Sequence, residues 1–392
     1  NSRPDADVVR CDKNGPMPDA APWSRVRSEL YALIGRNPRS NRRLVSIAAL
    51  EPSHVVLDMT ANIYDYDGKN VWTFLRVEND TLVTGYRQTT GWARTRTVYF
   101  AIEFDRPFSA YGHRRLDSTP YGGFYRRFDQ EKNFPEMAGR EIRAHFDFDV
   151  AEGDQLQVKV ALSPTSTAGA LKNLAAELPH WSFDRVRREA REAWNRELGR
   201  IEVETMTDDQ RSTFYTALYH AMIAPNLASD VDGRYRGMDG RVHLAEERRH
   251  HTVFSLWDTF RSAHPLYTLI ETERTREFVE TMLAMYDQGG RLPVWELAAN
   301  ETDTMIGYHS IPVIADAYIK GIRGFDALLA LEAMVDSATR DHFGLAAYRR
   351  QGFIGSEDDG ESVSKTLEYA YDDWCIARLA EELGEYHLAD GY

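Results

Sequence analysis

The stretch EIRAHFDFDVAEGDQLQVKVALS, at positions 141–163, decides the fold of the first part of the chain. In both of its halves, Glu141–Val150 and Gln155–Ser163, apolar residues alternate with polar ones. This period of two buries one face of an antiparallel sheet and leaves the other face in water. The Glu-Gly-Asp at 152–154 is a turn signal between the halves. The stretch therefore predicts two antiparallel strands.

Similar short segments lie upstream of this pair. They are rich in Val, Tyr, Phe and Thr and are separated by turn residues; they are His54–Thr60, Thr73–Asp80, Thr81–Arg87 and Thr97–Phe104. Several short strands at this spacing are typical of a β-sandwich. We predict such a domain over residues 1–165, within which 1–44 match no recognisable pattern.

Downstream of the strands the pattern changes to a helical one. Residues 166–205 carry apolar residues at helical spacing and dense mixed charge, which predicts a helical linker. From Thr207 onward nearly everything is helical. Asp208 or Thr207 is expected to cap a helix that ends at Pro225, and further helices are expected at 257–286, 303–320, 325–338 and 364–384. Residues 206–392 therefore predict an all-α toroid or bundle.

Length and charge exclude several classes of protein. The 392 residues fit two domains. Lys plus Arg is 47 and Asp plus Glu is 61, so the formal net charge is −14 and general nucleic-acid binding is not expected. No apolar run reaches the roughly 18–20 residues of a membrane span. The two cysteines, Cys11 and Cys375, allow one disulfide or none.

The segment LWDTFRSAHPL, Leu256–Leu266, is the first with residues suited to chemistry. Trp257, Asp258 and Arg261 fall within one helical turn. An aromatic face beside a carboxylate and a guanidinium can stack on a sugar and hydrogen-bond its hydroxyls. The same residues could instead form an internal Asp258–Arg261 ion pair beside a core tryptophan, and the pattern alone leaves both interpretations open.

The second such segment is Arg291–Gly321. Glu301 lies in a loop-like stretch with other polar residues, and loops often carry function. His309 and Asp316 follow on a mostly apolar helix, seven residues apart and so on one face. A single histidine on an apolar helix is more often a satisfied core residue than a functional one.

The third segment, Gly352–Trp374, contains four acidic residues at 357–361. Such oxygens suit calcium, but their spacing differs from that of an EF-hand loop, and a solvated acidic loop is the simpler interpretation. The chain contains no P-loop, GxGxxG, HExxH, CxxC or GxSxG motif. Paired carboxylates are then the expected catalytic groups, and these indicate glycoside hydrolysis.

Five landmarks in order resemble glycoside hydrolase family ninety-two. They are GYRQTTGWA followed by VYFAIEFDRPF, the linker NLAAELPHWSFDRVRREAREAWNREL, and then LWDTFRSAHPL, MIGYHSIPVIADAYIKGIRGFD and SKTLEYAYDDW. The resemblance implies a β-sandwich followed by an (α/α)6 toroid, both incomplete in this chain, with 206–392 as the first half of the catalytic domain. It also implies an inverting exo-α-mannosidase that depends on calcium, acts on N-glycan or mannan-type glycans and is secreted or periplasmic.

The resemblance assigns roles to few residues. Trp257 and Asp258 match a Trp-Asp pair that contacts the terminal mannose, and Glu301 and His309 lie in a segment bordering that site. Trp92 matches the GWA motif of the sandwich. The general acid and general base are expected beyond Tyr392, so none is assigned here, and most calcium ligands are also expected outside the chain. A different sugar-active enzyme on the same two-domain plan, or a carbohydrate-binding remnant without catalysis, remains an alternative.

Overall fold

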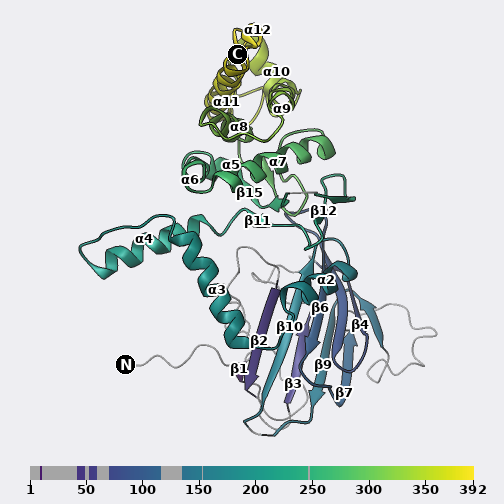
Figure 1. Ribbon diagram of the computed structural model, residues 1–392. Helices are drawn as coiled ribbons and strands as arrows, with labels where there is room; N and C mark the ends of the chain where they lie inside the picture. Colours follow the sequence, from purple (N-terminus) through teal and green to yellow (C-terminus); the bar gives the residue numbers. More distant parts are fainter. Residues whose placement is uncertain are drawn as a thin grey trace, which may run out of the picture. The chain divides into compact units, whose positions relative to one another are not determined.

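A computed structural model describes residues 9–10, 42–48, 53–59, 70–115, 135–151, 153–245 and 248–392. These residues divide into two compact units. The first extends to Glu197 and also includes Asp230–Asp232, and the second comprises Leu198–Ser229 and Gly233–Tyr392. Strands dominate the first unit and helices the second (Figure 1), which confirms the predicted order of fold classes. Cys11 and nearly all of residues 1–44 lie outside the described residues.

The described strands of the first unit form two sheets. The larger sheet has the order β1-β2-β10-β6-β5-β4-β8, and the smaller has the order β3-β9-β7. Among the described strands, only β1 and β2 pair in parallel. The strands are β1 (Val9–Arg10), β2 (Arg42–Ala48), β3 (Ser53–Asp58), β4 (Asn70–Val77), β5 (Leu82–Thr89), β6 (Arg96–Phe104), β7 (Ala110–Arg115), β8 (Glu136–Gly139), β9 (Ile142–Phe148) and β10 (Gln155–Ser163).

An aromatic core joins the two sheets into a sandwich. The ring of Phe104 on β6 lies 5.4 Å from that of Phe146 and 5.1 Å from that of Phe148, both on β9. Alternate residues of β9 are buried in this core. The alternation in the 141–163 stretch therefore predicted β9 correctly.

Helix α2 (Thr167–Glu177) covers the opposite face of the larger sheet (Figure 1). Its Ala170 packs against Ala101 of β6 and Ala161 of β10, and these three small residues are fully buried. At Gly169 an added Cβ would lie 2.5 Å from Ser163 Oγ and from an Asp230 oxygen. The close packing of α2 on the sheet therefore requires glycine at this position.

A buried carboxylate fixes the short segment Asp230–Asp232 to the first unit. Asp230 is 4% exposed and accepts hydrogen bonds from Ser163 Oγ at 2.8 Å, Thr165 Oγ1 at 2.5 Å and Asn173 Nδ2 at 2.8 Å. Asn173 in turn accepts the Val231 amide at 2.9 Å. A carboxylate removed from water needs such donors.

The remaining elements are helices and short strand pairs. They are α3 (Phe183–Leu198), α4 (Asp208–Ala221), β11 (Asn226–Leu227), β12 (Arg234–Arg236), β13 (Val242–Leu244), β14 (His251–Thr252), β15 (Phe254–Ser255), α5 (Leu256–Thr259), α6 (Ala263–Ile270), α7 (Thr272–Gly289), β16 (Trp295–Glu296), α8 (Ser310–Ile319), α9 (Ala327–Thr339), α10 (Leu345–Gln351), α11 (Ser362–Leu383) and α12 (Tyr386–Ala389). Helices α7, α8, α9 and α11 share one apolar core. Among the described residues, no helix has the length and apolar character needed to cross a bilayer.

The helix predictions succeed where caps and periodicity agree and fail in the loops. Thr207 caps α4 and forms a capping box with Gln210. The helix expected at 257–286 is three separate helices, α5, α6 and α7. The helix expected from 303 begins only at Ser310, because Asp303, Met305 and Gly307 all have positive φ values, which a right-handed helix excludes.

The Asp230 contacts lead to a stability prediction. Asp230→Ala leaves two hydroxyls and one amide without their acceptor, and should lower the free energy of unfolding by about 2–4 kcal/mol. Asp232→Ala is the matched control, because Asp232 forms a partly exposed ion pair with Lys172 at 2.8 Å, which is worth about 1 kcal/mol or less. Chemical denaturation followed by circular dichroism measures both. Equal losses in the two variants would contradict the role given to Asp230.

Candidate functional site

The Trp257–Asp258 pair lies on a short helix that a strand pair positions. Strand β15 pairs with β16, and α5 begins directly after β15 at Leu256, which is fully buried. Asp258 is exposed, and its carboxylate accepts a hydrogen bond from the Ser255 hydroxyl. An anchored carboxylate that faces solvent is available to bind the hydroxyl groups of a ligand.

Arg261 connects the Trp257–Asp258 pair to helix α11. Its guanidinium lies over the Trp257 ring at 4.7 Å and pairs with Glu368 of α11 at 3.5 Å. The internal Asp258–Arg261 ion pair considered from the sequence is therefore replaced by an Arg261–Glu368 pair. The Trp257 Nε1 atom is buried without a hydrogen-bond partner among the described residues.

His309 is buried between two carboxylates of α11. Its Nδ1 lies 2.8 Å from Asp372 Oδ1, and its Nε2 lies 3.2 Å from Glu368 Oε2, an ion-pair distance without hydrogen-bond alignment. The Phe260 ring stacks on the imidazole at 4.0 Å. His309 therefore belongs to a network that extends through Glu368 to Arg261.

Tyr308 ties the same network to two adjacent aspartates. Its amide donates to Asp372 at 2.9 Å, and its hydroxyl donates to Asp373 at 2.7 Å. Burial raises the pKa of Asp372, an effect that the hydrogen bonds from His309 and the Tyr308 amide oppose. Burial also raises the pKa of Asp373 to about 6.

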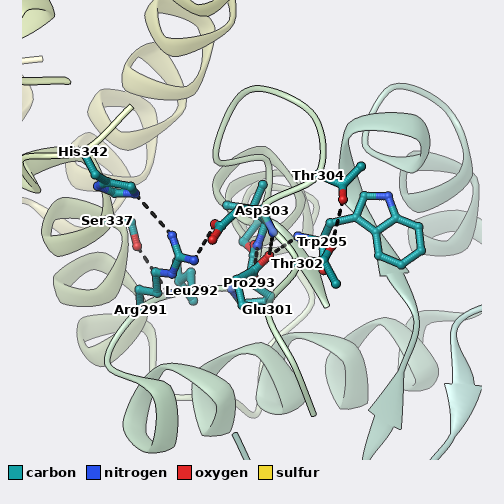
Figure 2. Close-up of polar contacts among 12 residues, drawn as sticks. Arg291, Leu292, Pro293, Trp295, Glu301, Thr302, Asp303, Thr304, Ser337 and His342 are labelled. Carbon is teal, nitrogen blue, oxygen red and sulfur yellow. Dashed lines mark hydrogen bonds and ion pairs between the residues drawn. The ribbon is translucent and has the colours of Figure 1, made fainter. Parts of the chain in front are cut away.

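Glu301 holds its own loop together. Its carboxylate accepts the backbone amide of Val294 at 2.7 Å. It also accepts the backbone amides of Trp295 at 2.9 Å and Asp303 at 2.8 Å (Figure 2). Glu296, fully buried nearby, accepts hydrogen bonds from Thr252 and two backbone amides, and burial raises its pKa to about 7. With three amides bound, Glu301 is committed to shaping the 294–303 loop.

The other sequence candidates lie elsewhere. Trp92, 53% exposed, is in the β5–β6 connection of the first unit. Asp316, on α8, pairs with Lys320 at 2.7 Å. In the acidic loop, Asp358 accepts the Gly355 amide and Asp359 pairs with Lys365, so these carboxylates serve local structure.

Sequence reasoning did not identify Glu368 or Asp372 as site residues. They are four residues apart in TLEYAYDDW and therefore share one face of α11. That spacing was the available signal. Their partners, Arg261 and His309, lie far away in the sequence and could not be inferred from it.

Both units match one protein family. Residues 46–163 match the glycosyl hydrolase family 92 N-terminal domain, and residues 169–392 match the glycosyl hydrolase family 92 catalytic domain. A curated protein of Arthroderma benhamiae, described as an uncharacterized secreted glycosidase, is 28% identical over 254 residues, which is 59% of this chain and 29% of that protein.

Solved structures agree with this match. A GH92 α-mannosidase from Bacteroides thetaiotaomicron, also solved with mannoimidazole, has a TM-score of 0.81 and 34% identity over 89% of this chain and 46% of its own. An inverting GH92 mannosidase from the same organism has a TM-score of 0.78 and 31% identity over 89% of this chain and 47% of its own. The chain thus spans less than half the length of the solved relatives that it matches.

The raised pKa of Asp373 predicts a pH effect on stability. The folded protein holds the Asp373 proton more tightly than the unfolded chain, where the pKa has its ordinary value of 3.8. The carboxyl therefore stabilises the fold fully below about pH 4, and this contribution is lost as the pH rises through about 6. Asp373→Asn, which stays neutral, should gain about 2–3 kcal/mol of unfolding free energy relative to the wild type between pH 4 and 7.

Denaturation midpoints at pH 4, 5, 6 and 7 measure this difference. Asp341→Asn is the control, because the Asp341 side chain is 77% exposed in its pair with Arg349. The difference in denaturation midpoint between Asp341→Asn and the wild type should be the same at all four pH values. If the difference in stability between Asp373→Asn and the wild type were also independent of pH, burial would not raise the pKa of Asp373.

Proposed function

Because the chain belongs to glycosyl hydrolase family 92, we propose that the protein it represents is a glycosidase that removes terminal α-mannose units by inversion. The observation that carries the proposal is the match to both family domains, which together include residues 46–163 and 169–392. Mannose is proposed as the sugar because two solved relatives are mannosidases, and one of these is described as inverting. N-glycan or mannan-type glycans are the proposed substrates.

The geometry of this chain supports a role in binding the terminal sugar. Asp258 presents an exposed carboxylate, and a carboxylate accepts hydrogen bonds from two adjacent hydroxyls at once. Arg261 lies over the Trp257 ring and pairs with Glu368, and Glu368 lies 3.2 Å from His309 Nε2. A network of this kind keeps the ligand-binding groups in place before the sugar arrives.

We propose that the general acid and base of the reaction lie outside this chain. An inverting glycosidase needs two carboxyl groups about 6.5–9.5 Å apart, one to protonate the leaving oxygen and one to activate water. Glu301 and Asp372 are committed to backbone amides and His309. This chain therefore contributes sugar recognition, and no proton-transfer role is assigned to its residues.

Calcium dependence and export are proposed for the whole protein. Family membership is consistent with calcium dependence, but the described residues contain no group of three or more His, Cys, Asp or Glu side chains that could hold a metal ion. These residues do not fit a calcium site, and no ligand is assigned among them. Export is proposed because the Arthroderma benhamiae relative is described as secreted.

Activity of an Asp258 variant tests the proposed sugar contact. In the whole protein, Asp258→Asn should lower kcat/KM on an aryl α-mannoside by about 10- to 100-fold, because charge-assisted hydrogen bonds to the sugar are lost. Asp316→Asn, which alters a carboxylate paired with Lys320, should leave kcat/KM unchanged. Binding of the mannoside without any turnover by the wild type would instead favour a carbohydrate-binding remnant.

Removal of calcium tests the proposed cofactor. Dialysis of the whole protein against a calcium chelator should abolish turnover of the aryl α-mannoside. Added Ca²⁺ should restore turnover more effectively than Mg²⁺, because Mg²⁺ demands a smaller octahedral site. Full activity in the presence of the chelator would refute calcium dependence and leave the mannosidase assignment intact.

A further inference from the structure

The second unit contains a pocket that the proposed sugar contact does not use. Its volume is about 130 Å³, similar to an engineered cavity of about 150 Å³ that admits a benzene ring. Its walls come from the α7–α8 loop, the α9–α10 connection and the first turns of α11. Trp257, Asp258 and His309 are absent from its lining, although Tyr308, the neighbour of His309, is part of it.

The floor of the pocket is apolar and aromatic, and its rim is open. Tyr369 and Leu345 are 3% and 1% exposed, and the Tyr369 ring stacks on the Tyr308 ring at 4.8 Å. Met305 and Phe343 on the rim are 51% and 43% exposed. A ligand can therefore enter from solvent and place an apolar face on aromatic rings.

One wall is polar and held in place by internal contacts. Arg291 pairs with Asp303 and lies 3.3 Å from His342 Nε2 (Figure 2). Since Arg291 donates to Nε2, we assign the His342 proton to Nδ1, and burial together with the Arg291 charge lowers the pKa of this imidazole. The wall thus offers donors and acceptors whose positions are fixed.

The three cations that line the pocket already have carboxylate partners. Arg291 pairs with Asp303, Lys365 with Asp359 at 3.2 Å, and Arg340 with Asp336 at 2.7 Å. An anionic ligand would have to compete with these carboxylates for their cations. The pocket therefore favours a neutral ligand that uses both donors and acceptors.

Backbone strain is concentrated at this pocket. Among the described residues, seven other than glycine have positive φ values, and four of these line the pocket: Asp303, Met305, Phe343 and Glu361. Each such conformation costs on the order of 1–3 kcal/mol and is retained when the surroundings impose it, most often at functional sites. The strain therefore supports a binding role for the pocket beyond its shape.

We propose that this pocket is a second binding site, for one neutral pyranose unit of the glycan. A pyranose has the required ring size, an apolar face for Tyr369 and Phe343, and hydroxyls for Arg291, His342 and Glu361. The choice of mannose as the sugar rests on the proposed function. Binding itself does not require turnover.

Ligand titration of the present chain tests the proposal. Methyl α-mannopyranoside, followed by saturation-transfer NMR, should bind with a Kd on the order of 1–10 mM. Phe343→Ala and Glu361→Gln should each raise that Kd at least about fivefold, because they remove the ring platform and a charged acceptor. The matched controls, Phe353→Ala and Glu357→Gln, alter similarly exposed residues outside the pocket and should leave the Kd unchanged.

The measurements are repeated in an Asp258→Asn background. Persistence of binding in this background, with the same sensitivity to Phe343→Ala, separates the pocket from the proposed terminal-sugar contact. Turnover by the whole protein without saturable binding at the pocket would overturn this inference and leave the proposed function intact. A Kd that Phe343→Ala and Glu361→Gln leave unchanged would also overturn it. Tenfold tighter binding of mannose 6-phosphate would refute the proposal that the ligand is neutral.

Discussion

The candidate site depends on the buried carboxylate of Asp372. This side chain is fully buried on α11, and its two oxygens hold the Tyr308 amide and His309 Nδ1 at the entrance to α8. Taking a charge out of water is costly, and these two hydrogen bonds offset that cost. The bonds also fix the position at which the α7–α8 loop meets α11. Glu368 of α11 pairs in turn with Arg261, whose guanidinium lies over the Trp257 ring.

The loop before α8 is held in an unfavourable backbone conformation by a second set of contacts. Ala298, Ala299, Asp303 and Met305 have positive φ values, and Glu301 binds three amides of the same loop. Hydrogen bonds to a charged group are stronger than those to a neutral one, so a single carboxylate can stabilise several strained residues. The loop can therefore present a rigid surface without regular secondary structure.

Much of the fold was predictable from the sequence, because periodicity records which face of an element is buried. The alternation in Glu141–Ser163 predicted β9 and β10, and Thr207 marked the start of α4. Strand β7, with the sequence AYGHRR, lacks that alternation and was missed. The segment before Ser310 was predicted to be helical. Its positive φ values, which exclude a helix, cannot be read from its sequence pattern.

The site was only partly predictable. Trp257, Asp258 and His309 stood out as polar or aromatic residues in unusual places, and the structure links Trp257 and His309 through Arg261 and Glu368. Adjacent residues on a helix, such as Asp372 and Asp373, point in directions about 100° apart. Both nevertheless converge on Tyr308, one at its amide and the other at its hydroxyl, because one tyrosine is long enough to meet both.

The three-residue segment Asp230–Asp232 has a consequence for how this gene can be divided. The chain enters the helical unit at Leu198, returns to the strand-rich unit for these three residues, and leaves it again at Gly233. No single cut in the coding sequence therefore separates the two units intact. A strand-rich piece that ends near Glu197 lacks the acceptor for Ser163, Thr165 and Asn173. Recombination that exchanges only one unit would break this connection, so the two units are expected to be inherited together.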